Sequence, residues 1–240
     1  MSKKSNNAIN IISWISIGAI AIATAALVII LSFMNGLTGL VQSLYNSFDP
    51  DLEITAAKGK TFVPDSAKLL ELNKIEGVKF VSFSLEDNAL VKYGDKQSFV
   101  TVKGVSEEFM RMTRFDTMIT EGNKVLHTTS QRFGILGKGV AYHLSANIKD
   151  NTTPMIFYAP KRGRTSGLDP SSSLNEAEVI PGSYFTINDE FDFKYVLVDL
   201  EVARELFDYT NEVSSLEIGL TERNLSAEAK TKIEKLFGND

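Results

Sequence analysis

Residues able to do covalent or metal chemistry are few in this sequence, and they are not spaced as a site. Cysteine is absent, which excludes thiolate nucleophiles, thiolate metal ligands and disulfides. The two histidines, His127 and His143, do not stand at metal-ligand spacing with acidic partners. The motif that places a serine on a nucleophile elbow is also missing. We therefore expect no catalytic residue, no metal site and no cofactor.

A glycine-rich run in the middle of the chain differs from a phosphate-binding loop. The run Gly134-Ile135-Leu136-Gly137-Lys138-Gly139 lacks the required spacing, and neither Ser nor Thr follows the lysine. The glycines are interpreted as turn residues ahead of a helix near 140–147. ATP binding by that route is excluded.

The charge of the chain argues against a nucleic-acid partner. The net charge is -5, whereas phosphate binding needs clustered lysine and arginine. One short basic run, Lys161-Arg162-Gly163-Arg164, opens a stretch at 161–177 that is rich in Gly, Ser and Pro and is interpreted as a loop. Lys161, Arg162 and Arg164 are candidates for contact with lipid headgroups, a ligand or a partner. A solvated loop is the favoured, plainer interpretation.

The N-terminal stretch from Ile9 to Phe33 carries no charged residue. About 20 apolar residues in a helix span a hydrocarbon core of about 30 Å, so this stretch predicts a transmembrane helix. A cleaved signal peptide is disfavoured because its apolar region is shorter and Ala23-Thr24-Ala25 lies in mid-run. A buried soluble helix is disfavoured because no polar face is present. Lys3 and Lys4 favour a cytoplasmic N-terminus.

Helical spacing of apolar residues continues past the membrane stretch. It predicts a stalk helix at 34–49 that ends at Asp49-Pro50, since proline disfavours helix in the residue before it. Ala19 and Ala23, four residues apart, would let another helix approach closely, although alanine is common in membrane helices. Gly36 is interpreted equally as a hinge or as a close-packing site.

The remaining residues predict an α+β domain with an insertion. Strands are expected at 51–55, 78–85, 89–93, 97–105, 195–198 and 213–220. Helices are expected after the capping residues Asp65 or Ser66, Asp199 and Ser226, the first of them running to Glu76. The expected division is a cytoplasmic end at 1–8, a membrane helix at 9–33, a stalk at 34–49, a core formed by 50–108 with 188–240, and an inserted subdomain at 109–187.

Two segments carry a family resemblance: Ile12-Ser13-Trp14-Ile15-Ser16-Ile17-Gly18 and Leu31-Ser32-Phe33-Met34-Asn35-Gly36. Together they resemble the first membrane helix of lipoprotein-releasing (Lol-type) ABC transporter permeases, within the FtsX/MacB-like group. Looser matches are Gly77-Val78 with Gly104-Val105, Gly137-Lys138-Gly139-Val140-Ala141, and the stretch from Tyr195 to Asp199. The resemblance covers essentially the whole chain.

The resemblance implies a subunit of a larger machine in the bacterial inner membrane. Such permeases have four membrane helices and a periplasmic domain with a ferredoxin-like α+β part and an inserted, mostly β part. Two permease subunits associate with two cytoplasmic ATPase subunits, so the chain itself is not expected to be an enzyme. In Lol-type members, ATP hydrolysis drives mechanical work outside the membrane. That work extracts a lipoprotein and passes it to a periplasmic chaperone. The residues that would pack a helix or line the substrate entry are Ala19, Ala23, Gly36, Leu37, Leu40 and Leu44.

The sequence departs from this family pattern because it ends at Asp240, before a second membrane helix. We expect a fragment of a longer permease, without the cytoplasmic helix that meets the ATPase. Two alternatives stay open: a permease of the same family with an efflux or cell-division role, and a single-pass, membrane-anchored sensor or binding module.

Overall fold

The computed structural model describes residues 3–45, 48, 50–162, 173–221 and 226–238. The chain divides into two compact units, Met1–Tyr45 and Asn46–Asp240. The first unit is one helix, α1 (Lys3–Tyr45), so the expected membrane and stalk segments form a single continuous helix that ends before the expected residue 49. Within α1, Ile9–Leu40 is long and apolar enough to cross a membrane, by length and composition.

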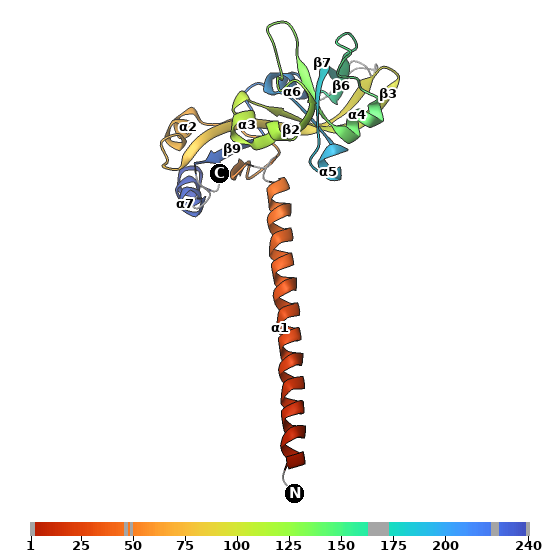
Figure 1. Cartoon of the computed structure of the whole chain (residues 1–240). Coiled ribbons are helices and arrows are strands. Elements are labelled where there is room, and N and C mark those ends of the chain that lie inside the picture. Colours follow the sequence, from red (N-terminus) through yellow and green to blue (C-terminus); the bar gives the residue numbers. More distant parts are fainter. Residues whose placement is uncertain (1–2, 46–47, 49, 163–172, 222–225, 239–240) are drawn as a thin grey trace. The chain divides into compact units, whose positions relative to one another are not determined.

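The second unit has the expected α+β class (Figure 1). Its strands form a nine-stranded sheet in the order β1-β9-β2-β3-β8-β5-β7-β4, with β6 pairing β2 and β7. The strands are β1 (Leu52–Thr55), β2 (Val78–Tyr93), β3 (Lys96–Val105), β4 (Ile119–Gly122), β5 (Phe133–Gly137), β6 (Met155–Pro160), β7 (Leu174–Phe185), β8 (Tyr195–Asp199) and β9 (Ser215–Leu220). The helices are α2 (Ser66–Leu72), α3 (Glu107–Met112), the 3-10 helix η1 (Arg114–Thr117), α4 (Lys138–Leu144), α5 (Asp189–Asp192), α6 (Leu200–Phe207) and α7 (Ser226–Phe237).

β2 is one strand of 16 residues, so the expected break between 85 and 89 is wrong. Its polar middle still pairs: Glu86 lies opposite Lys103, and Asn88 lies opposite Thr101. The polar side chains mark a polar face of the sheet rather than a turn. The N-terminal part of β2 pairs with β9, and the C-terminal part pairs with β3 and β6.

The strand pairings close a ring: β2 pairs with β3, β3 with β8, β8 with β5, β5 with β7, β7 with β6, and β6 with β2. One apolar cluster joins the inner side chains of these strands to α4 and α6. β5 and β7 belong to the expected insertion at 109–187, yet β5 hydrogen-bonds directly to β8. The boundaries of that insertion stay a prediction.

Three glycines interpreted as turn residues prove to be packing positions. Gly134 lies inside β5, Gly137 ends that strand, and Gly139 lies in α4. A Cβ atom on Gly137 would collide with the backbone oxygen of Asp192, and one on Gly139 with the ring of Phe193. The turn interpretation is therefore wrong: Gly134 lies against Met155, and the close approach of Asp192 and Phe193 requires Gly137 and Gly139.

α2 and α7 pack together on one face of the β1-β9-β2 part of the sheet (Figure 1). Asp65 caps α2 as expected, since its side chain accepts a hydrogen bond from the amide of Ala67 at 2.8 Å. α2 nevertheless ends at Leu72, four residues before the expected end at Glu76. Asp199 caps α6 in the same way, through the amide of Glu201. β7 begins at Leu174, so the end of the expected loop at 161–177 is a strand.

Gly104→Ala should destabilise the second unit by about 1–3 kcal/mol, because overpacking a close-packed site forces shifts. A Cβ atom on Gly104 would collide with that of Ala203 on α6. The free energy of unfolding in urea measures the effect, and Gln97→Ala, at an exposed position of the same strand, is the control. Equal stability of the two variants would show that α6 does not pack on β3 this closely.

Candidate functional site

One face of the sheet carries polar side chains across four neighbouring strands. Glu53 on β1 lies opposite Glu217 on β9, and Glu217 lies opposite Ser82 on β2. Further along, Glu86 on β2 lies opposite Lys103 on β3. Side chains alternate between the two faces of a strand, so these residues share one face while the apolar residues between them point to the other. We call this surface the polar face.

Lys103 and Glu217 form an ion pair inside the domain. The Lys103 Nζ atom lies 2.7 Å from Glu217 Oε1, and the two side chains are 7% and 1% exposed. The pair bridges β3 and β9 across β2, which lies between them. Breaking a buried pair by removing one partner leaves an uncompensated charge, which typically costs about 3–5 kcal/mol.

The protonation of the pair follows from its surroundings. Burial by itself lowers the pKa of Lys103, but the carboxylates of Glu217, Glu86 and Glu53 outweigh it and raise that pKa. Burial raises the pKa of Glu217, and the charge of Lys103 opposes the rise. Lys103 therefore stays a cation at neutral pH and supplies the positive charge that Glu217 needs.

Phe48 packs against the Lys103 end of this pair. Its side chain is buried, and its ring centroid lies 4.6 Å from Lys103 Nζ, a cation–π distance. The ring also contacts other aromatic rings of the second unit: Phe191 at 4.5 Å, Tyr195 at 5.0 Å, Phe115 at 6.0 Å and Phe109 at 6.3 Å. A short sequence, Asn46-Ser47, separates Phe48 from the last residue of α1. Phe48 thus lies in the core of the second unit, three residues after the end of α1 in the sequence.

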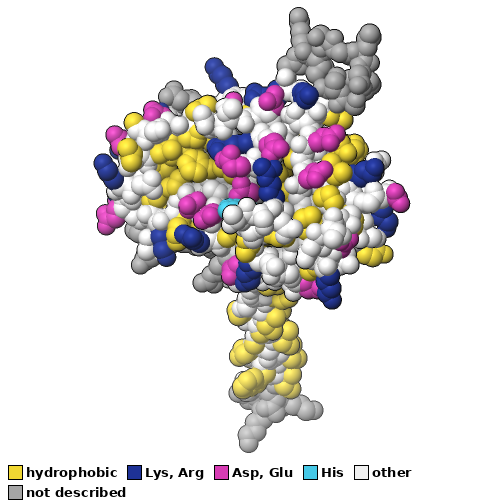
Figure 2. Space-filling view, turned by 90° about the horizontal axis from the view of Figure 1, so that it is seen from above, with side chains coloured by type: hydrophobic (Ala, Val, Ile, Leu, Met, Phe, Trp, Pro, Cys, Tyr) yellow, Lys and Arg dark blue, Asp and Glu magenta, His cyan; other side chains and the backbone are white. Residues whose placement is uncertain are grey.

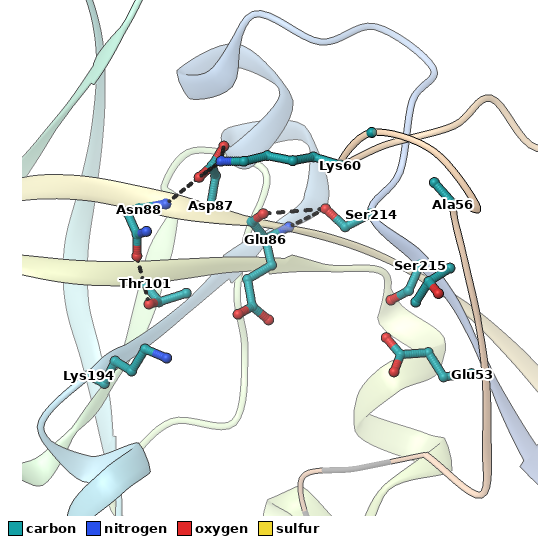
Figure 3. A pocket seen from close by; sticks show the side chains of 12 residues that line it. Glu53, Ala56, Lys60, Glu86, Asp87, Asn88, Thr101, Lys194, Ser214 and Ser215 are labelled. Atoms are coloured by element: carbon teal, nitrogen blue, oxygen red, sulfur yellow. Dashed lines mark hydrogen bonds and ion pairs between the residues drawn. The ribbon is translucent and has the colours of Figure 1, made fainter.

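A cavity of about 370 Å³ opens on the same polar face (Figure 3). Glu53 and Glu86 point toward this space, and Lys194 lies at one end of it. Thr101 donates to Asn88 Oδ1 at 3.0 Å, and Lys60 binds both carboxylate oxygens of Asp87 at 2.9 and 3.0 Å. Tyr195 donates its hydroxyl to Glu86 Oε1 at 2.9 Å. The wall is polar and mixed in charge.

Within the described residues, no group of His, Asp and Glu side chains able to hold a metal ion is found. His127 lies 2.9 Å from Asp199 Oδ2 and 3.8 Å from Glu107 Oε1, acidic neighbours that the fold brings from distant parts of the sequence. Asp199 also caps α6, so the contact ties the β4–β5 connection to that helix. The partner of His127 is therefore Asp199, a residue that caps a helix.

The membrane-helix candidates lie along α1 and are exposed in the described part of the chain. Ala19, Ala23, Leu37 and Leu40 are exposed, and a Cβ atom on Gly36 would meet nothing within 4 Å. The side chain of Leu44 lies outside the described residues. Within the described residues, these positions of α1 are exposed, so their packing role stays a prediction.

The basic run is partly tied to the domain. The guanidinium of Arg162 lies 4.0 Å from the centroid of the Tyr209 ring, and its Nη1 atom lies 3.6 Å from Glu212 Oε1. Lys161 is exposed, and its amide donates to the carbonyl of Ser173 at 2.9 Å. Arg164 lies outside the described residues. Over the face drawn in Figure 2, basic and acidic side chains are interspersed with hydrophobic ones.

Sequence reasoning missed Lys103, Glu217 and the role of Phe48. A signal was present: Lys103 is the one charged residue between Phe99 and Val105, and Glu217 is the one charged residue between Val213 and Leu220. A lone charge inside a stretch of strand that is otherwise uncharged indicates a buried partner. The identity of that partner depends on strand order, which the pattern alone does not give.

Lys103→Met should lower the free energy of unfolding at pH 7 by about 3–5 kcal/mol, because Glu217 is left buried without a cation. Adding Glu217→Gln should recover part of the loss. The exposed pair is the control: Lys60→Met should cost at most about 1 kcal/mol. Urea unfolding measures all three variants, and no recovery in the double variant would contradict the assigned pairing.

Lys103→Met should also make stability depend on pH. Without the cation, the pKa of Glu217 in the folded protein rises further above its ordinary value of 4.5. The free energy of unfolding of Lys103→Met, relative to wild type, is then highest below pH 4.5. It falls as the pH rises through the raised pKa of Glu217 in the folded protein. Unfolding measured between pH 4 and pH 8 tests this, and a difference from wild type that is constant over the range would refute it.

Three comparisons place the chain among known proteins. A sequence profile of the MacB-like periplasmic core domain matches residues 13–157, more than half of the chain. The lipoprotein-releasing system transmembrane protein LolE of Haemophilus influenzae is 26% identical over 231 residues, which cover 91% of this chain and 52% of that protein. This chain therefore spans about half the length of that relative.

Among solved structures, the extracellular domain of the ABC-type transporter YknZ from Gram-positive bacteria matches with a TM-score of 0.48 and 15% identity, over 78% of this chain and 94% of that one. The periplasmic region of MacB from Actinobacillus actinomycetemcomitans matches with a TM-score of 0.48 and 11% identity, over 74% and 80% of the two chains. The profile match decides the family: the chain belongs to the MacB-like periplasmic core domain family, among the MacB- and LolE-like ABC transporter permeases.

Proposed function

We propose that this chain is the N-terminal part of a permease subunit that does mechanical work in the periplasm, most specifically the release of lipoproteins from the inner membrane. Its N-terminus lies in the cytoplasm, α1 crosses the inner membrane, and residues 46–240 lie in the periplasm. A separate cytoplasmic ATPase subunit hydrolyses ATP. The similarity to LolE over 91% of the chain supports the lipoprotein substrate.

The observation that carries the proposal is the burial of Phe48 directly after α1. A helix transmits displacement because its backbone hydrogen bonds are satisfied internally. Two residues of sequence separate the end of α1 from Phe48, and we infer that displacement of α1 is passed on to Phe48. Phe48 is 2% exposed and contacts rings from α3, η1, α5 and β8. Force on the helix would therefore act on the core of the domain and not on a loose loop.

The exposed positions of α1 receive roles within this proposal. Ala19, Ala23 and Gly36 would pack against a neighbouring membrane helix of the same or a second permease subunit. Leu37, Leu40 and Leu44 would line the entry of the lipoprotein's acyl chains, since apolar side chains replace the lipid environment. Lys161, Arg162 and Arg164 would contact a periplasmic partner such as a chaperone, with Arg162 held in place by Tyr209.

Phe48→Ala should uncouple ATP hydrolysis from release. Removing a buried phenylalanine ring typically costs about 3–5 kcal/mol of stability. In the whole permease with its ATPase, we expect ATP hydrolysis to continue while lipoprotein transfer to a soluble acceptor falls at least tenfold. Transfer from proteoliposomes is the measurement. Phe99→Ala, at a side chain that is 82% exposed, is the matched control and should leave transfer unchanged.

Phe48→Leu keeps an apolar anchor, so it separates coupling from folding. If the domain with Phe48→Ala unfolds, Phe48→Leu should fold and give intermediate transfer. Wild-type transfer by both variants would reject the anchor as the coupling element. Wild-type permease that never copurifies with or transfers a lipoprotein would reject the substrate and leave another substrate of the same family.

A further inference from the structure

Lys103 does not pair with the carboxylate that lies directly opposite it. Glu86 on β2 is the cross-strand partner of Lys103, and facing residues of an antiparallel pair have Cβ atoms about 4.5–5.5 Å apart. Lys103 instead reaches across β2 to Glu217 on β9. Glu217 lies opposite Ser82, which precedes Glu86 by two turns of the strand's alternation on the same face. The cation therefore takes the more distant of two carboxylates.

The two carboxylates differ in their need for a cation. The side chain of Glu217 is 1% exposed, so it has little water to replace Lys103. Glu86 is half-buried and points toward the cavity of about 370 Å³ on the polar face, and its Oε1 atom accepts a hydrogen bond from the Tyr195 hydroxyl at 2.9 Å (Figure 3). A buried carboxylate without a cation is costly, whereas a solvated one is not. The cation therefore goes to the carboxylate that needs it more.

Phe48 contacts both side chains that decide this choice. Its ring centroid lies 4.6 Å from Lys103 Nζ, and the ring of Phe109 lies 5.2 Å from the same atom. The Phe48 ring also lies 5.0 Å from the ring of Tyr195, the residue that donates to Glu86. A single side chain from the residues that follow α1 thus packs against the cation and against the donor that occupies the alternative carboxylate.

The Phe48 ring keeps water away from the cation. Lys103 is 7% exposed, and its Nζ atom lies 2.7 Å from Glu217 Oε1, so water admitted beside Nζ would also be next to that carboxylate. Attraction between two charges is far weaker in water than in a dry interior. Once Glu217 is hydrated, it no longer requires Lys103. The lysine stem is flexible, and Glu86 directly opposite is then the nearer partner.

We propose that Lys103 is a cation with two positions: it pairs with Glu217 while Phe48 is packed in the core, and it turns to Glu86 when Phe48 leaves. In the first position the ion pair ties β3 to β9 across β2. In the second position it joins only the neighbouring strands β3 and β2. The inference rests on the proposed function, in which displacement of α1 moves Phe48. Withdrawal of Phe48 would thereby release the tie between β3 and β9.

Double-mutant cycles test the proposal, because they measure the coupling between two chosen side chains. Urea unfolding of the chain 1–240 gives one cycle from Lys103→Met with Glu217→Gln and another from Lys103→Met with Glu86→Gln. With Phe48 present, the coupling to Glu217 should be the larger. In the Phe48→Ala background the order should reverse, and the coupling to Glu217, expressed as a ratio of unfolding equilibrium constants, should fall at least tenfold.

The exposed pair formed by Lys60 and Asp87 is the matched control. A cycle of Lys60→Met with Asp87→Asn should give the same coupling in both backgrounds. If the domain with Phe48→Ala does not fold, Phe48→Leu takes its place and the same reversal is required. A coupling to Glu217 that stays the larger would overturn the proposal. Loss of both couplings would also overturn it, because Phe48 would then only exclude water.

These cycles need neither the ATPase nor a lipoprotein, so they are scored separately from the proposed function. A permease that transfers lipoprotein, while Lys103 stays coupled to Glu217 in the Phe48→Ala background, rejects this inference alone. Reversal of the two couplings in a permease that transfers no lipoprotein rejects the proposed function alone.

Discussion

Lys103 and Glu217 meet at 2.7 Å where almost no water reaches them, on strands that lie on either side of β2. A buried ion pair contributes little net stability compared with apolar packing, but an unpaired charge in the same place is costly. A slip of one residue in β3 or β9 would turn one of the charges onto the apolar face. The pair therefore fixes the register of three strands, and it gives Phe48 the cation against which its ring packs.

The sequence patterns that predict this structure are local ones. The uncharged stretch predicts α1, and Asp65 and Asp199 cap helices where expected, because a capping side chain acts within a few residues. Some boundaries are also wrong, such as the end of α2 and the start of β7, but the larger failures are long-range. The continuity of β2 depends on partners from β3 and β9, and Gly137 is required by the backbone of Asp192. Residue types alone do not reveal which strands become neighbours, so neither the ion pair nor the anchor could be read from them.

The family assignment and the site support one another at different levels. The profile match over residues 13–157 shows the family, while the burial of Phe48 shows that the packed core of the second unit begins three residues after α1 in the sequence. In the described residues, His127 contacts Asp199, which caps α6, and Lys60 pairs with Asp87. What the arrangement offers is a tightly packed core around Phe48 and a buried ion pair beneath it.

β2 belongs both to the closed ring of strands and to the three strands covered by α2 and α7. At about 3.3 Å per residue, its 16 residues span roughly 50 Å, so one strand runs through both parts of the domain. Glu86, opposite Lys103, lies near its middle, and Phe48 lies over Lys103. Phe48 therefore lies over the stretch where β2 passes from the ring of strands to the part covered by α2 and α7, and this one strand joins the packing around Phe48 to both parts of the domain.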